Sequence, residues 1–412
     1  MSVRLQHPAS SQVKRRTPAP FCSFDVLRTD ADLNALESEW RELFDRSGTR
    51  NPFVHPAWMI PWLGRFVPDA ADRLVIAVRR NGELVALAPF YRNSYGLGSA
   101  RCRVLQLAGG GQTNDRLMEM SEILVFPGDR RRILRALLHH LALDAGGWDW
   151  LGLTLPAQHG WFENEWLPDT WQRRGANVVH KGVRAFVVLP LPASWSGLPL
   201  KRNLKEALRR SRNRLEAQSG AVETSFAERE EVPAAIESLI ELHRRRADST
   251  DHLRHDDYFR DGVTDSLVRD AAERWAAHGN AAVSLLRLDG VPIAGRLLLH
   301  ANRGVFLSFS GFEPEHWRLG ASAMLTAAAV RRSIENGDEF VNFSSSPDSA
   351  KLRWSEQLEF QHEFLVVAPS RRSRLLFAAW WQLRARRLLV RSRRLVTDQL
   401  VVRGDGQPPR PL

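Results

Sequence analysis

Two segments, one in each half of the chain, show the same alternation of hydrophobic and polar positions around a two-residue turn. The first spans 74–90 around an Asn-Gly pair, and the second spans 283–299 around an Asp-Gly pair. Such pairs between apolar runs favour a β-hairpin, because both turn residues must adopt positive φ. When the two segments are aligned at Gly82 and Gly290, their flanking apolar residues align as well. Matching hairpins in matching order suggest that one fold is used twice.

Helical and strand-like patterns alternate around both hairpins. Helical spacing is expected over 30–44, 133–143, 200–218, 233–246, 258–278 and 320–335. Apolar runs typical of strands lie at 103–107, 150–155, 184–189, 305–310, 339–343 and 360–367. Asp30 is placed to cap the first helix. The alternation predicts an α/β fold with a mixed α+β sheet, and the repeated hairpin suggests two tandem domains.

Length and composition agree with a soluble globular protein. The 412 residues suffice for two or three domains, and 43% hydrophobic with 25% charged residues is an ordinary balance. No apolar run approaches the ~18 residues that span a bilayer. We expect a disordered basic tail over 1–22, an N-terminal domain over 23–195, a C-terminal domain over 196–370, and a basic amphipathic helix with a tail over 371–412. We expect a cytoplasmic location, because the first twenty residues are polar and the two cysteines have no disulfide spacing.

Two arginine-rich clusters stand out against a net charge of +11. The cluster at 201–214 is either a solvated helix or a surface for acidic sugar, phosphates or RNA. The cluster at 371–396 interleaves arginines with leucines around Trp380 and Trp381. It is either a helix on the inner face of an anionic membrane or a terminal helix docked on its own domain.

The segment after the second hairpin has the features of an anion site. An apolar strand ends near Ser310, and Gly320, Ala321 and Ser322 open a long apolar helix. A helix start leaves unpaired N–H groups with a partial positive charge, and small residues let an anion approach them. Arg318 adds a mobile cation. The alternative is that these small residues only allow close packing.

Four motifs, in order, resemble a known family. They are Asn51-Pro-Phe-x-x-Pro-Ala-Trp58 followed by Trp62, Leu288-Asp-Gly-x-Pro-Ile-Ala294, Ser310-Gly-Phe-Glu-Pro-Glu315 and Lys351-x-x-Trp354. The chain resembles the GCN5-related N-acetyltransferase (GNAT) superfamily over about 24–367. It is most similar to a double-domain branch, the BioF2-like acetyltransferases associated with bacterial cellulose and exopolysaccharide production.

The resemblance implies an acyl-CoA (acetyl-CoA) co-substrate. We place it in the C-terminal domain, because only the second hairpin leads into a helix start suited to a phosphate. Carried onto this chain, it assigns pantetheine to the backbone of Ser308, Phe309 and Ser310. It assigns the pyrophosphate to Arg318, Gly320, Ala321 and Ser322. Three residues depart from the family pattern and bear on whether this copy is active: Trp317, Asn342 and Ala350.

Acyl transfer to an amine needs a route for the amine proton, donors facing the thioester oxygen, and alignment of the two reactants. Glu313 is the leading candidate base, although a solvated glutamate is the simpler interpretation. Lys351 and Asp348 are candidates for acceptor binding or proton transfer, or else form a surface salt bridge. In the family, the loop with Asn114 and Asp115 lies near the domain junction. We therefore assign both residues, with Trp354, to acceptor binding.

The segment from His252 to Asp257 has metal-ligand residue types, but a polar cap and loop explain it better, and no metal is expected. The preferred function is N-acylation of an amine, such as an amino sugar of envelope or exopolysaccharide metabolism. One alternative is aminoacyl transfer from tRNA, as in the Fem peptidyltransferases, which use the same double fold. Another is a catalytically silent, membrane-associated partner of polysaccharide assembly. Nucleic acid is expected only in the tRNA alternative.

Overall fold

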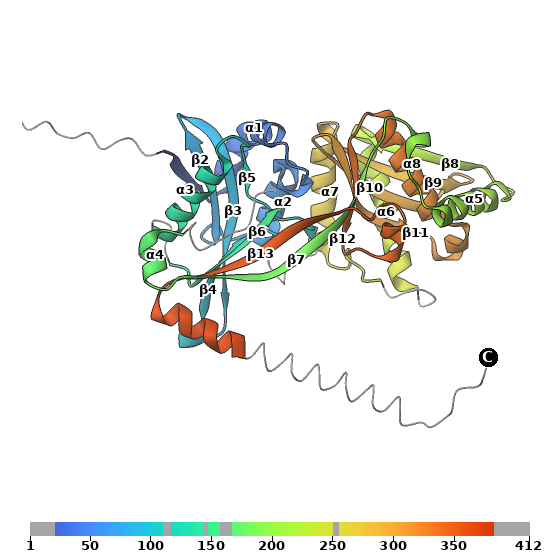
Figure 1. Cartoon of the computed structure of the whole chain (residues 1–412). Helices are drawn as coiled ribbons and strands as arrows, with labels where there is room; N and C mark the ends of the chain where they lie inside the picture. The colour runs from blue at the N-terminus through green and yellow to red at the C-terminus, as the bar shows by residue number, and fades with distance from the viewer. Residues whose placement is uncertain (1–20, 110–116, 144–146, 157–166, 250–254, 383–412) are drawn as a thin grey trace, which may run out of the picture.

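The computed structural model describes residues 21–109, 117–143, 147–156, 167–249 and 255–382. Its halves lie side by side along one continuous sheet (Figure 1). The N-terminal half contains β1 (Ser23–Leu27), α1 (Asp30–Ser47), η1 (Pro52–Val54), α2 (Pro56–Phe66), β2 (Arg73–Arg80), β3 (Glu83–Tyr95), η2 (Gly98–Ala100), β4 (Cys102–Leu107), β5 (Leu124–Val125), α3 (Arg130–Leu143), β6 (Trp150–Pro156), α4 (Asp169–Arg173) and β7 (Asn177–Pro190).

The C-terminal half repeats this order of elements and is followed by a further helix over 371–382. Its elements are η6 (Trp195–Gly197), α5 (Arg202–Glu216), β8 (Val222–Glu228), η7 (Arg229–Glu231), α6 (Val232–Asp248), α7 (Gly262–Ala277), β9 (Ala281–Leu288), β10 (Val291–Ala301), β11 (Gly304–Phe312), η8 (Pro314–Leu319), α8 (Ala321–Glu335), β12 (Phe340–Ser345), α9 (Ser349–Leu352) and β13 (Leu358–Val367).

The predicted α/β class with a mixed sheet is confirmed. The strand order is β1-β2-β3-β4-β6-β13-β7-β12-β11-β10-β9-β8, with β5 added beside β3. In each half a hairpin, β2–β3 or β9–β10, leads into β4 or β11. These two strands pair in parallel with β6 and β12 respectively, and the other pairs are antiparallel. The same order of parts therefore occurs twice.

Both predicted hairpin turns form, with left-handed backbone at both central positions. Asn81 and Gly82 have φ of 54° and 85°, and Asp289 and Gly290 have 51° and 77°. This is the φ pattern of the tight turns that match the twist of paired strands. The first helix differs from expectation in one detail. Thr29, not Asp30, caps it, since the Thr29 hydroxyl accepts the Asp32 amide hydrogen bond at 3.1 Å.

The two halves exchange their last strands. In Figure 1, β13 lies among the strands of the N-terminal half, and β7 runs beside it toward β12. Strand β13 pairs with β6 on one side and with β7 on the other. Strand β7 in turn pairs with β12. Each half is therefore completed by a strand from the other.

A shared hydrophobic core joins the halves where α1 and α2 meet α6 and α7. Its largest members are fully buried: Trp40, Trp58, Trp62 and Trp275. The motif at 51–58 builds this junction. Asn51 accepts the Phe53 amide hydrogen bond at 3.0 Å and His55 accepts that of Ala57 at 3.1 Å, so each caps a short helix. Burial lowers the pKa of His55 to about 3, and the imidazole stays neutral.

Candidate functional site

The parallel strands β11 and β12 part after three residue pairs. Their register runs from Gly304 opposite Phe340 to Phe306 opposite Asn342, whereas β11 continues to Phe312. Within the described residues, no strand covers this side of β11 beyond Phe306. An exposed strand edge offers main-chain donors and acceptors to an extended ligand. The parting therefore leaves a strand edge of β11 to which an extended molecule could pair like an added strand.

A β-bulge lies in the same stretch of β11. The register between β10 and β11 slips between Arg296 and Leu298, so Ser308 and Phe309 together face one residue of β10. Bulges redirect side chains and interrupt the regular ladder. The Ser308 hydroxyl is buried and finds no hydrogen-bond partner among the described residues. Two of the three residues predicted to contact pantetheine thus occupy irregular backbone at the parting.

Helix α8 begins just beyond the end of β11. Gly320 precedes it with φ 74° and ψ 27°, and its carbonyl accepts the amides of Ala323 and Met324 at 3.0 and 3.1 Å. The amides of Ala321 and Ser322 have no acceptor in the described part of the chain. Unpaired N–H groups at a helix start favour an anion. The predicted anion site therefore has two main-chain N–H donors.

Helix α5 closes one side of this turn. A Cβ added to Gly320 would lie 2.1 Å from the Ser211 hydroxyl oxygen, so only glycine fits there. Arg214 donates a hydrogen bond of 2.8 Å to the Arg318 carbonyl. Ser322 is half-buried, and the Arg318 side chain is exposed. An anion would have to approach from the side of these last two residues.

The candidate base Glu313 is engaged in an ion pair. Its carboxylate accepts a hydrogen bond of 2.7 Å from Arg245 on α6, and the Glu313 side chain is 18% exposed. Glu313 lies at the end of β11 as expected, and its catalytic role stays a prediction.

Lys351 reaches the turn that follows β12. Its ammonium donates to the Ser345 carbonyl, to the Ser346 carbonyl at 3.3 Å and to the Ser344 hydroxyl at 3.3 Å. Burial lowers the pKa of Lys351, against the opposing charge of Glu119. Glu119 itself comes from the N-terminal half and accepts bonds of 3.0 Å from the Ser345 amide and hydroxyl. A carboxylate that the sequence did not single out therefore joins this site.

The other two residues predicted near Lys351 have structural partners. Asp348 caps α9 and accepts the amides of Ala350 and Lys351 at 2.8 and 2.9 Å. Trp354 is 7% exposed and stacks on Phe343 with ring centroids 5.8 Å apart. Trp354 belongs to the core beneath β12, and the assignment of both residues to chemistry stays a prediction.

Replacing Trp354 by phenylalanine distinguishes a role in core packing from a role in acceptor binding. Because Trp354 fills core volume against Phe343, we expect a loss of about 1–2 kcal/mol in unfolding free energy. We expect an unchanged KM for the acceptor. Denaturant unfolding and steady-state kinetics measure the two effects, and a raised KM at unchanged stability would contradict the core role.

Two arginines near the bulge have no acidic partner. Arg296 lies opposite Ser310, and Arg246 at the end of α6 sits over the Phe312 ring at 4.9 Å. No carboxylate of the described residues forms an ion pair with either. Burial lowers the pKa of Arg296 to about 10, so it remains cationic at neutral pH. The site is therefore more basic than the sequence predicted.

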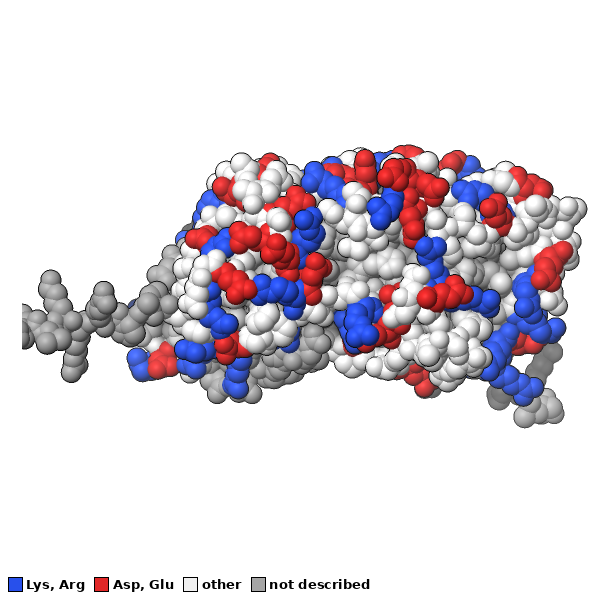
Figure 2. Space-filling view, turned by 90° about the horizontal axis from the view of Figure 1, so that it is seen from above, with Lys and Arg blue, Asp and Glu red and all other residues white. Residues whose placement is uncertain are grey.

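Several predicted residues lie outside the described structure or away from the site. Asn114 and Asp115 fall outside the described residues, as does His252. Among the residues that can be examined, no three His, Cys, Asp or Glu side chains come together as metal ligands. The arginines of α5 are exposed, and Figure 2 shows basic side chains gathered at that end of the molecule. Three of them, Arg209, Arg210 and Arg212, pair within the helix with Glu206 or Glu216.

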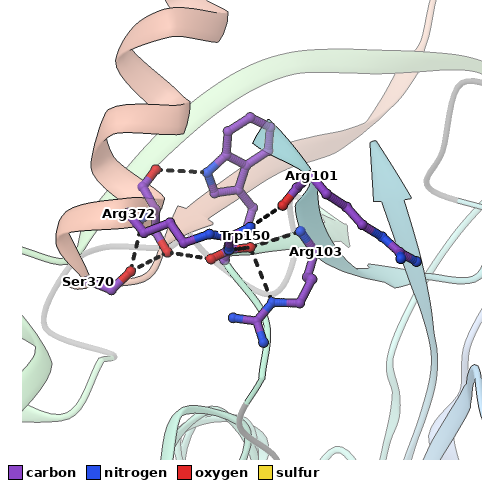
Figure 3. Close-up of polar contacts among 7 residues, drawn as sticks. Arg101, Arg103, Trp150, Ser370 and Arg372 are labelled. Carbon is purple, nitrogen blue, oxygen red and sulfur yellow. Dashed lines mark hydrogen bonds and ion pairs between the residues drawn. The ribbon is translucent and has the colours of Figure 1, made fainter. Parts of the chain in front are cut away.

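The helix over 371–382 docks on the N-terminal half (Figure 3). Asp149 is 1% exposed and accepts hydrogen bonds from Arg372 at 2.5 Å and from the Ser373 hydroxyl at 3.0 Å. Trp150 donates to the Ser373 carbonyl at 3.3 Å and packs edge-on against Trp380. The first part of the 371–396 cluster therefore adopts the docked alternative. Residues beyond 382 lie outside the described structure, and in the rest no helix is long and apolar enough to cross a membrane.

The Asp149→Asn variant should loosen this terminal helix. Burial tends to raise the pKa of Asp149, but hydrogen bonds from Arg103, Arg372 and Ser373 outweigh it and lower the pKa. The variant loses charge-assisted bonds, so we expect a cost of about 1–3 kcal/mol and faster amide exchange over 371–382. The wild type should show the same loosening only as the pH falls below the ordinary aspartate range. Unchanged exchange rates would show that the aromatic contacts alone hold the helix.

Comparisons with known proteins agree with this geometry. Residues 202–352 match the family model described as an acetyltransferase (GNAT) domain. The chain is similar in structure to the C-terminal domain of an Agrobacterium fabrum protein described as a lysylphosphatidylglycerol synthetase, with TM-score 0.50, 12% identity, and coverage of 85% of this chain and 95% of that one. It is also similar to FemX, with TM-score 0.51, 12% identity, and coverage of 81% and 96%.

None of the curated proteins compared with the chain matches it. The structural similarities, at 12% identity, concern the fold alone. The family match places a GNAT-type acyltransferase domain in the C-terminal half, around the parting of β11 and β12. The likeness to the BioF2-like branch stays a prediction.

Proposed function

We propose that this protein is an acyl-CoA-dependent N-acyltransferase whose acceptor is a small amine, such as an amino sugar used in envelope polysaccharide synthesis. The observation that carries the proposal is the parting of β11 and β12, with a bulge at Ser308 and Phe309, directly before the helix start at Gly320. Coenzyme A supplies the activated acyl group. In the proposal its pantetheine pairs with the free edge of β11, and its diphosphate meets the amides of Ala321 and Ser322.

The residues of this chain then act by position and charge. The bulged backbone holds the acyl-bearing end of the ligand beside Arg296, and a cation there stabilises negative charge developing on a carbonyl oxygen. Glu119 and Lys351 lie at the end of β12, where the acceptor would approach. Alignment of the two reactants supplies a large share of the rate in such reactions.

Ligand stabilisation and a product assay test the proposal. Purified protein should melt at a higher temperature with coenzyme A or acetyl-CoA, because a ligand that binds only the folded state stabilises it. Mass spectrometry should then detect an N-acetylated product with an amine acceptor such as glucosamine. No thermal shift at millimolar coenzyme A would overturn the proposal.

We further propose a cytoplasmic location, with the arginine-rich segment 371–396 touching an anionic membrane. The exposed Leu375 (71%) and Trp381 (51%) on the docked helix support this, because apolar residues among arginines favour a lipid interface. The full chain should float together with anionic vesicles, and the chain without residues 371–412 should not. Equal flotation of the deleted chain would contradict the membrane contact.

A further inference from the structure

A cavity of about 210 Å³ lies at the junction of the two halves, where the exchanged strand β13 meets the loop before β5. Its buried floor includes Asn51, Glu122, Phe186 and Gln361, all at most 5% exposed. Its rim includes Phe360, which is 41% exposed. Pockets for drug-sized ligands occupy about 300–1,000 Å³. This cavity therefore suits a smaller molecule, about one sugar ring in size.

One donor on the floor lacks an acceptor. The side-chain amide nitrogen of Gln361 is buried without a hydrogen-bond partner in the described part of the protein, whereas the Asn51 side chain forms a hydrogen bond with the Glu122 carboxyl. The side-chain oxygens of Asn51 and Gln361 are used, by the amides of Phe53 at 3.0 Å and Ser121 at 3.4 Å. A buried donor without a partner costs about 1–3 kcal/mol. A ligand with acceptor oxygens would recover this cost.

The third polar group of the floor is a carboxyl. Glu122 accepts a hydrogen bond of 2.8 Å from the Thr49 hydroxyl. Burial raises the pKa of Glu122 to about 7, so the group can accept a bond when ionised and donate one when protonated. At the rim, Arg50 is ion-paired with Glu359. Among the described residues that line the cavity, the one cation, Arg50, is already paired, and Glu122 favours hydroxyl and amine donors.

Apolar walls complete the site. Phe186, Leu358 and Pro156 line the cavity beside the polar floor. A mostly apolar wall with a few fixed polar groups is the usual composition of a small-molecule pocket. A sugar ring presents both kinds of surface, since its C–H faces are apolar and its hydroxyls lie around the edge.

The cavity lies close to the end of β12, on the side of β7. Phe186 lies opposite Ser345, the last residue of β12, in the β7–β12 register. Glu119, three positions before Glu122, binds the Ser345 amide at 3.0 Å. A molecule in the cavity would therefore sit next to the end of β12, on which Lys351 also converges.

We propose that this cavity binds the acyl acceptor, and that the acceptor is a hydroxyl-bearing ring with an amine, held by Asn51, Glu122 and Gln361. The inference rests on the proposed function, since it names the acceptor class of the same enzyme. Acidic sugars are disfavoured, because the Arg50 guanidinium is already paired with Glu359 and an ionised Glu122 would repel a second carboxylate.

Binding of simple sugars to the full chain, without coenzyme A, tests the assignment. The probes are D-glucosamine, D-glucose and D-glucuronate, measured by saturation-transfer NMR and calorimetry. We expect glucosamine to bind more tightly than glucose, and glucuronate not to bind. Gln361→Leu and Glu122→Gln should each weaken glucosamine binding at least tenfold. Gln357→Leu, the same change at an exposed position before β13, should leave it unchanged.

Melting curves show whether each variant is folded. Phe360→Ala, at the exposed rim, should also weaken glucosamine binding without changing the floor of the cavity. Absence of glucosamine binding to the wild type, or undiminished binding in Gln361→Leu, overturns the assignment. The coenzyme A thermal shift is measured on the same samples. A shift without sugar binding refutes the cavity assignment alone, and sugar binding without a shift refutes the acyltransferase proposal alone.

Discussion

Replacing Ser322 by glutamate is expected to leave the protein folded and to weaken coenzyme A binding by about 100-fold or more. Ser322 is half-buried in the first turn of α8, and its amide is one of the two that lack an acceptor among the described residues. A carboxylate in the first turn of a helix is favourable by about 0.3–1 kcal/mol, so the free protein should not lose stability. The same charge would occupy the place of the diphosphate and repel it.

Thermal unfolding in the presence of coenzyme A measures this effect. A ligand at 100 times its Kd stabilises by about 2.7 kcal/mol, and a 100-fold weaker affinity reduces that gain to a few tenths. Ser322→Gln has the same shape without the charge and should keep most of the shift. An equal shift in wild type and Ser322→Glu would place the diphosphate elsewhere.

The second large effect is expected at Glu122, as a change in how stability depends on pH. Burial raises the pKa of Glu122 from 4.5 to about 7, so the folded state binds more protons than the unfolded state between these values. Stability from this group is therefore fully present below about pH 4.5 and is lost as the pH rises through 7. A shift of this size corresponds to about 3 kcal/mol.

Glu122→Gln should remove this dependence. We expect the variant to gain stability relative to wild type between pH 5 and pH 8, by about 2–3 kcal/mol. Urea unfolding at the two pH values gives the difference. Glu42→Gln, an exposed carboxylate on α1, serves as the matched control and should show no such gain. Parallel pH profiles for wild type and Glu122→Gln would mean that the carboxyl stays ionised through a partner.

The hairpins and the helix that begins after Gly320 were predictable because their signals are local. An Asn-Gly or Asp-Gly pair requires positive φ at two adjacent residues whatever surrounds it, and Gly320 follows the same logic at a helix start. The exchange of β7 and β13 could not be predicted. Strand β13 is apolar enough to pair in either half, and its partners are chosen by contacts far apart in the sequence.

Polar residues of the site carried weaker signals. Glu119 and Glu122 follow a glycine-rich loop and have no motif, so only the fold shows that they meet β12 and Asn51. Arg296 interrupts an apolar strand, and a charged residue at such a position is a signal for a polar site. The assignment of Trp354 to acceptor binding rests on the resemblance alone. The motif Lys351-x-x-Trp354 does not show whether the tryptophan side chain faces a site or the core.

The exchanged strands affect how the chain is made. During synthesis the N-terminal half leaves the ribosome without the strand that belongs between β6 and β7, because residues 358–367 are translated after every other strand of the sheet. Until then it presents open strand edges, which tend to associate with other chains. Neither half should fold when expressed separately, and the nascent chain should depend on chaperones until β13 is released.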